Sequence, residues 1–176
     1  MAYLVISSSL NPKSRSRQLA LIALNALKDM EASVDWLDLA ECSIPFCDGN
    51  VAYEDSQTKE LANKINRAKG VLFAVPIYNY YANAAAKNLI ELTGSAWTDK
   101  IVGFLCAAGG KGSYMSVMSL ANSLMLDFRC LIIPRFVYST GEAFKDEKVS
   151  DPEVRNRINE LAKELHYISN ALNKKS

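Results

Sequence analysis

Three short polar segments carry the residue types that hold small ligands, and each one follows an apolar run that is typical of a strand. They read SSSLNPKSRS at 7–16, PIYNYYANAA at 76–85 and AAGGKGS at 107–113. The first offers hydroxyl groups and one arginine, which bind phosphate, and the second offers amides and aromatic rings, which suit a flat polar ligand. The third offers glycines, which let a backbone approach a ligand closely.

The first segment contains no glycine, and this argues against the two common loops that hold phosphate mainly through backbone. A G-x-G-x-x-G turn, which contacts the pyrophosphate of a dinucleotide, is missing. A G-x-x-x-x-G-K-[ST] loop is also missing, because Leu105 and Gly112 occupy two of the positions that it requires around Gly110-Lys111. A terminal phosphate monoester remains, since hydroxyl groups and the free N–H groups of a following helix can surround its three outer oxygens.

Ser9, Ser14 and Ser16, with Arg15 and Arg17 beside them, are the candidates for such a phosphate site. The same serines also suit a plain polar turn and a helix N-cap. This segment alone leaves both interpretations open.

The sequence contains few of the residues and motifs that hydrolases and metalloenzymes use. His166 is the single histidine and lies beside an apolar stripe, which predicts a surface or edge residue, and neither G-x-S-x-G nor H-E-x-x-H occurs. The four cysteines, at 42, 47, 106 and 130, form no C-x-x-C pair. Disulfides and a metal site are therefore less favoured than reduced structural thiols, and we expect no metal.

Length and charge describe an ordinary globular chain. Its 176 residues, 49% of them hydrophobic, predict a single domain over 1–176. A formal net charge of +1 gives no electrostatic reason to expect nucleic acid or an anionic membrane as partner. No apolar run approaches the roughly 18 residues that span a bilayer, and the N-terminus does not read as a signal peptide. We expect a cytoplasmic protein.

Strand and helix patterns alternate along the chain. The expected strands are 3–7, 34–37, 71–75, 101–106 and 130–133, the last resumed after Pro134 at 136–138. The expected helices are 16–30, 56–68, 84–92, 112–126 and about 152–172, and Gly70 is expected to end the second. This alternation predicts an α/β doubly wound domain, a five-stranded parallel sheet with helices on both faces, which binds ligands beyond the carboxyl ends of its strands.

The three segments together resemble the NADPH-dependent FMN reductase family, flavodoxin-like enzymes that include azo, quinone and chromate reductases. The family reads G-S-L-R-x-x-S-x-[NST], then P-x-Y-N, then a Gly-Gly turn; this chain offers SSLNPKSRS at 8–16, PIYN at 76–79 and Gly109-Gly110. The likeness continues through AAAKNLIEL and through FKDEKVSDPEVRNRINELAKEL. Ser8 replaces the usual glycine and Asn11 the usual arginine. The resemblance implies strand order 2-1-3-4-5.

The resemblance also implies where FMN would bind. Its phosphate would lie on Ser9, Ser14, Arg15 and Ser16. Asn11 and Arg17 are also expected among the cofactor-binding residues: Asn11 lacks the phosphate contact of the usual arginine, which Arg15 or Arg17 could replace. The isoalloxazine ring would be edged by Pro76, Ile77, Tyr78 and Asn79, above the turn formed by Gly109, Gly110 and Lys111. The Gly109-Gly110 backbone would stabilise negative charge on the flavin, and no side chain of the protein is expected to act as a catalyst.

The activity implied by the resemblance is an FMN-dependent NAD(P)H oxidoreductase with a ping-pong order. NADPH or NADH would reduce FMN, and a small-molecule acceptor would follow: free flavin, a quinone, an azo compound or a metal oxyanion. The apolar helices at 84–92 and 112–126 predict a homodimer or homotetramer. Two alternatives stay open: a flavodoxin-type electron carrier, which the near-neutral charge disfavours, and a non-catalytic interaction or regulatory domain.

Overall fold

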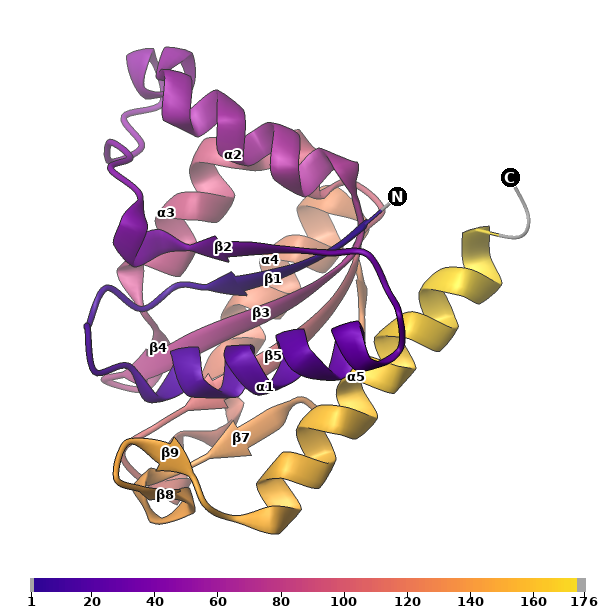
Figure 1. Cartoon of the computed structure of the whole chain (residues 1–176). Helices are drawn as coiled ribbons and strands as arrows, with labels where there is room; N and C mark the ends of the chain where they lie inside the picture. The colour runs from indigo at the N-terminus through magenta and orange to yellow at the C-terminus, as the bar shows by residue number, and fades with distance from the viewer. Residues whose placement is uncertain (1, 174–176) are drawn as a thin grey trace.

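The computed structural model describes residues 2–173, and a parallel sheet runs through its centre (Figure 1). Its strands follow the order β2 (Val34–Asp38), β1 (Ala2–Ser7), β3 (Ala68–Tyr78), β5 (Ile101–Ala107) and β6 (Leu131–Ile132). β7 (Val137–Ser139) continues the edge position of β6 beyond Pro134, because both strands pair in parallel with β5. The predicted order of five parallel strands is confirmed.

Helices cover both faces of the sheet (Figure 1). α1 (Arg15–Asp29) and α5 (Pro152–Asn173) pack together on one face, while α2 (Ser56–Arg67), α3 (Ala84–Thr93) and α4 (Met118–Phe128) cover the other. Strand residues alternate between the two layers: in β1, Leu4 and Ile6 face α2–α4, whereas Tyr3 and Val5 face α1 and α5. Burial on both faces explains why the strands read as continuous apolar runs.

Short 3₁₀ segments fill several connections: Leu39–Glu41, Val51–Glu54, Gly94–Trp97, Lys111–Val117 and Gly141–Ala143. The segment Lys111–Val117 corrects the prediction of one helix over 112–126, because α4 begins only at Met118. Ser113 breaks regular helical geometry with φ −97° and ψ 25°. Gly110 and Gly112 beside it lower the helix propensity of this stretch, so the chain stays in a tight loop there.

Two β-hairpins lie at the carboxyl end of the sheet, and the sequence did not predict either. β3 turns back into β4 (Tyr81–Ala82), and β8 (Phe144–Lys145) pairs with β9 (Lys148–Val149). The central residues of both loops have positive φ: 51° and 62° at Asn79 and Tyr80, 48° and 62° at Asp146 and Glu147. Positive φ at both positions is the type I′ pattern, which usually shows itself as Asn-Gly or Asp-Gly.

Gly70 has a different role from the predicted one. α2 already ends at Arg67, and Gly70 lies within β3 under α5. A Cβ atom on Gly70 would lie 2.8 Å from Leu165 Cδ1 and 2.9 Å from Ser169 Oγ. The glycine therefore lets α5 approach the sheet closely.

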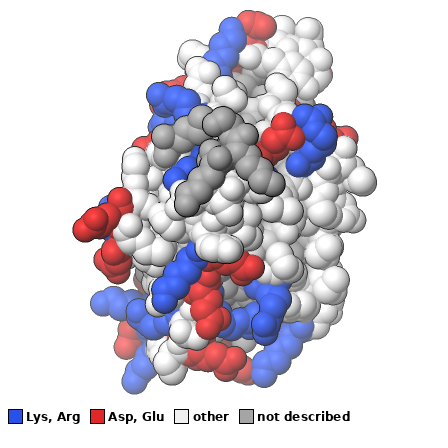
Figure 2. Space-filling model, turned by 90° about the vertical axis from the view of Figure 1, so that its right-hand side faces the viewer, with Lys and Arg blue, Asp and Glu red and all other residues white. Residues whose placement is uncertain are grey.

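The cysteines form no disulfide, and the surface carries charges of both signs. All four cysteines are free, and burial raises the pKa of the Cys106 thiol and raises that of Cys130 to about 11. On the face at the amino ends of the strands, basic and acidic residues are interspersed (Figure 2). Within residues 2–173, no helix has both the length and the apolar character that crossing a membrane requires.

We expect Gly70→Ala to destabilise the fold, because its methyl group would meet Leu165 and Ser169 at less than van der Waals distance. Overpacking of this kind costs about 1–3 kcal/mol, measurable by urea unfolding. Gly110→Ala is the matched control, since no described atom outside the adjacent residues lies within 4 Å of its Cβ position. A Gly70→Ala protein as stable as the wild type would contradict this account of α5 packing.

Candidate functional site

A hollow of about 1080 Å³ lies beyond the carboxyl ends of β1, β3 and β5, where the three polar segments meet. Its size is near the upper end for small-molecule sites. The residues predicted to bind the cofactor that line it are Ser9, Asn11, Ser14, Arg15, Ser16, Pro76, Ile77, Tyr78, Asn79, Gly109 and Gly110. Arg17 and Lys111, which were also predicted, are not among the lining residues.

Three serine hydroxyls gather at the start of α1. Ser9, Ser14 and Ser16 are nearly fully buried, and the hydroxyl oxygens of Ser14 and Ser16 lie 3.0 Å apart. Ser14 is the N-cap, since its Oγ accepts the N–H of Arg17 at 3.1 Å. The first turn of α1 contains no acidic residue. Hydroxyl donors at the positive end of a helix suit an anion such as phosphate.

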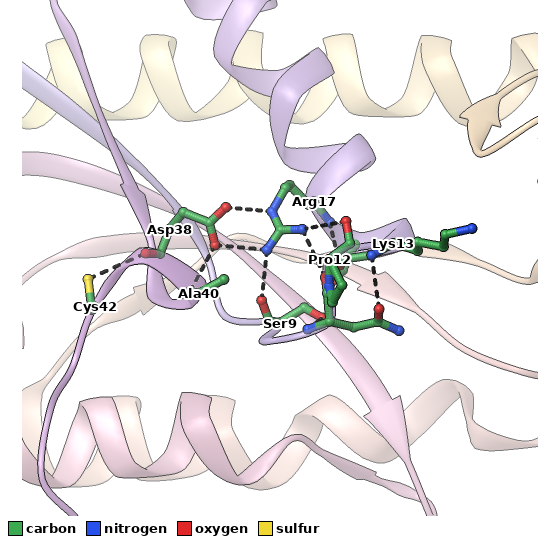
Figure 3. Close-up of polar contacts among 10 residues, drawn as sticks. Ser9, Pro12, Lys13, Arg17, Asp38, Ala40 and Cys42 are labelled. Atoms are coloured by element: carbon green, nitrogen blue, oxygen red, sulfur yellow. Dashed lines mark hydrogen bonds and ion pairs between the residues drawn. The ribbon is translucent and has the colours of Figure 1, made fainter.

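The side chain of Arg17 forms hydrogen bonds with the backbone of this loop (Figure 3). Its guanidinium donates to the carbonyl oxygens of Ser9 at 3.1 Å, Asn11 at 2.9 Å and Pro12 at 3.2 Å. It also forms a two-point ion pair with Asp38 at the end of β2, with Nη2 3.2 Å from Oδ1. The guanidinium of Arg17 therefore binds protein atoms. It does not line the hollow, so it does not take the predicted position beside the phosphate.

Asn11 also turns toward its own loop. Its Oδ1 accepts the N–H of Lys13 at 2.9 Å, and its own N–H donates to Ser9 Oγ at 3.3 Å. This local turn lets the chain pass from β1 to α1 without a glycine, because the asparagine side chain replaces a backbone hydrogen bond.

Ser8 connects the first segment to the second. It donates from Oγ to Asn83 Oδ1 at 2.8 Å, and Asn83 Nδ2 donates back to the carbonyl oxygen of Ser8 at 2.7 Å. Both residues are buried. The serine that departs from the family pattern thus fixes the β1–α1 loop against the start of α3.

The second segment forms one rim of the hollow. β3 continues through Pro76 and Ile77 to Tyr78, which is half exposed, and the type I′ turn then places Asn79 and Tyr80 at the tip. Asparagine tolerates this left-handed conformation better than most residues, so Asn79 is held in one place by the turn itself.

The third segment presents open backbone. Gly109 and Gly110 do not have positive φ, and within residues 2–173 no atom other than those of the adjacent residues lies within 4 Å of a Cβ built on either. The fold alone therefore does not require glycine here, and a side chain would instead occupy the hollow. Lys111 points away, with Nζ 3.4 Å from the Glu142 carboxylate on a well-exposed surface.

Tyr138 of β7 holds this segment in position. Its hydroxyl donates to the carbonyl oxygen of Gly110 at 2.5 Å and lies 2.7 Å from Ser113 Oγ. Tyr114 packs edge-on against the same ring at 5.3 Å. The two hydroxyl contacts fix the direction of the Gly110 peptide, and no pattern in the sequence indicates this role for Tyr138.

The hairpin β8–β9 adds lining residues that the sequence analysis missed. Phe144, Asp146 and Glu147 face the phosphate end of the hollow. The Arg15 guanidinium lies 5.6 Å from the centre of the Phe144 ring, and Lys13 Nζ is 3.2 Å from the Glu147 carboxylate. The polar pair Asp146-Glu147 between Lys145 and Lys148 was the available signal for a turn.

These residues fit FMN on the geometry alone. Buried hydroxyls and a helix N-terminus suit one phosphate, and the space in front of Gly109 and Gly110 suits a flat ring that needs close backbone approach. Both features open into the same hollow. The interpretation of Ser14 as a helix cap is confirmed as well, so the two roles considered for it are compatible.

Comparison with known proteins identifies the family of the chain. The family described as NADPH-dependent FMN reductase matches residues 1–145. An FMN-dependent NADH:quinone oxidoreductase from Bordetella petrii is 28% identical over 89% of this chain and 93% of that protein.

Solved structures share the fold. A flavoenzyme NAD(P)H:(acceptor) oxidoreductase from Paracoccus denitrificans has a TM-score of 0.73 at 17% identity, over 93% of this chain and 94% of that one. An azoreductase from Bacillus anthracis has a TM-score of 0.66 at 16% identity, over 97% and 100% of the two chains.

The family match covers most of the chain, and it confirms the resemblance on which the expected enzyme class and cofactors rest. The protein is an NAD(P)H-dependent flavin oxidoreductase that uses FMN. The chain belongs to the NADPH-dependent FMN reductase family.

Proposed function

We propose that the protein transfers electrons from NADPH or NADH to a small acceptor in a ping-pong order, and that the acceptor is a quinone. The observation that carries this proposal is the open Gly109-Gly110 backbone, which faces the same hollow as the buried serines. The relative from Bordetella petrii, named as a quinone oxidoreductase, supports the choice of acceptor.

The residues have distinct roles in this proposal. Ser9, Ser14 and Ser16 hold the FMN phosphate, and Arg15 supplies its positive charge from the edge of the hollow. When bound there, FMN would supply the hydride-accepting and electron-donating chemistry that connects the nicotinamide to the acceptor. Tyr138 fixes the Gly110 peptide, so that the turn is oriented before any charge develops near it.

The other lining residues define where the flat ligands lie. Pro76, Ile77, Tyr78 and Asn79 form the rim, and Asn79 offers both a donor and an acceptor to the edge of the ring. The rim residues Tyr78 and Tyr80 are exposed, and the hollow of about 1080 Å³ that they line is large enough for nicotinamide and acceptor to be bound one after the other. Sequential use of one site is compatible with a ping-pong order. Arg17 and Lys111 take no direct part.

The proposal includes an assembly of two or more copies in the cytoplasm. Apolar side chains around α4 are exposed in the single chain, with Met115 at 61% and Leu126 at 82% of their surface. Such residues suit a subunit contact. Four free thiols suit a reducing compartment.

Anaerobic spectroscopy tests this function directly. The purified protein, loaded with FMN, should lose its flavin absorbance when NADH or NADPH is added and regain it when a quinone follows. A bound flavin that neither nucleotide reduces would indicate an electron carrier instead. A protein that takes up no FMN would indicate a non-catalytic domain.

Gly109→Val is the matched variant for this experiment. The Cβ position lies more than 4 Å from every described atom outside the adjacent residues, so the side chain enters the hollow and not the core. We expect the variant to fold and to bind FMN at least about tenfold more weakly. Unchanged FMN affinity in a well-folded Gly109→Val protein would argue against the ring position.

Asp38→Asn tests whether Arg17 positions the phosphate loop. The variant keeps the shape of the side chain but removes the charge that holds Arg17, so we expect a loss of about 1.5–3 kcal/mol in unfolding free energy. FMN affinity should fall as well, because the carbonyls of Ser9 and Asn11 lose their fixed partner. Urea unfolding and fluorescence titration measure the two effects.

Asp99→Asn provides the control, because Asp99 pairs with Arg129 on an exposed surface at the other end of the sheet. Exposed pairs contribute only about 0–1 kcal/mol. Equal effects from the two variants would contradict a special role for Arg17.

A further inference from the structure

Arg15 is a cation of the candidate phosphate site whose charge is not neutralised by the protein. Lys13 forms an ion pair with Glu147 at 3.2 Å, and Arg17 is held by Asp38 and by carbonyl oxygens of its own loop. Arg15 lines the hollow, and its guanidinium forms no hydrogen bond or ion pair within residues 2–173. Its N–H donors are therefore available to an anion.

Two residues from the segment after β7 lie next to this guanidinium. A Cβ atom built on Gly141 would lie 2.9 Å from Arg15 Nη1 and 3.5 Å from Cζ. The same Cζ lies 5.6 Å from the centre of the Phe144 ring, within the range of a cation–π contact. Gly141 does not have positive φ, so its backbone does not require glycine. The space that a side chain would fill is instead occupied by the guanidinium.

The turn that carries both residues is anchored in the core. Gly141 begins the 3₁₀ segment Gly141–Ala143, and the N–H of Phe144 closes it by donating to the Gly141 carbonyl oxygen. Ala143 is buried, and its carbonyl oxygen accepts the N–H of Ser150 at 2.9 Å and the Ser150 hydroxyl at 3.3 Å. Arg15 is exposed, and its long side chain can change rotamer. A larger residue at position 141 would therefore displace the guanidinium and leave the turn in place.

We propose that Gly141 is a positioning residue for the cofactor, because it keeps open the space from which the Arg15 guanidinium reaches the FMN phosphate. This inference rests on the proposed function, which places the phosphate on the serines beside Arg15. It explains how the loop presents a cation although Asn11 stands where the family has arginine. The position of that cation is set by a residue far along the chain.

Flavin binding tests this inference without any turnover. Calorimetric titration with FMN and with riboflavin separates effects on the phosphate from effects on the ring. Arg15→Ala should weaken FMN binding at least about tenfold, as expected for loss of one charged hydrogen bond. Gly141→Ala should weaken it about threefold to tenfold, because the guanidinium is displaced and not removed. Riboflavin affinity should change less than about twofold in both variants.

The double variant Arg15→Ala/Gly141→Ala is the matched control. If Gly141 acts through the guanidinium, its substitution should change FMN affinity less than about twofold once the arginine is gone. An equal loss with and without the arginine would overturn the inference. Unchanged FMN affinity in Gly141→Ala, or an equal loss with FMN and riboflavin, would overturn it as well.

Thermal unfolding shows whether the alanine disturbs the turn. We expect the melting temperature of Gly141→Ala to stay within about 2 °C of the wild type, because the atom that it meets is the end of a flexible side chain. A larger fall would mean that the backbone moves, and it would overturn the claim. Equal affinity of the wild type for the two flavins would overturn the phosphate site together with this inference. Bound FMN that no nicotinamide reduces would overturn only the reductase function.

Discussion

The guanidinium of Arg17 connects the end of β2 to the loop between β1 and α1, and the site depends on this connection. The loop must bring three serine hydroxyls and the start of α1 to one place without the help of a glycine. Arg17 satisfies three of its carbonyl oxygens and is itself neutralised by the buried Asp38. A buried ion pair with well-placed hydrogen bonds is costly to break from one side. The loop therefore has a defined shape before any ligand binds.

Glycines serve two opposite purposes in this fold. Gly70 and Gly103 lie under α5, where Leu165 and Leu161 leave no room for a Cβ atom, so they close the core. Gly109 and Gly110 face empty space in the hollow, so they keep the site open. The sheet is the rigid frame. Hydrogen bonds of Ser8, Asn83 and Tyr138 hold the loops of the candidate site in fixed positions relative to it.

The sequence was sufficient for the features that follow from periodicity and local chemistry. Continuous apolar strands such as 71–75 identify a sheet covered on both faces, and the serines at 9, 14 and 16 mark the loop that we propose binds the phosphate. The role of Arg17 could not be predicted, because it depends on Asp38, which is 21 residues away. The hairpins at Asn79-Tyr80 and Asp146-Glu147 were missed because their positive φ values occur without glycine. Gly70 reads as a helix stop in the sequence, and only the packing of α5 reveals its purpose.

Comparing the binding of FMN with that of riboflavin tests the central claim, because the two flavins differ only in the phosphate. If the serine loop holds that group, calorimetric titration should show FMN binding about a hundredfold more tightly than riboflavin, as two charge-assisted hydrogen bonds would provide. Equal affinity for the two flavins would contradict the account, because the loop built by Ser9, Ser14 and Ser16 would then hold no phosphate.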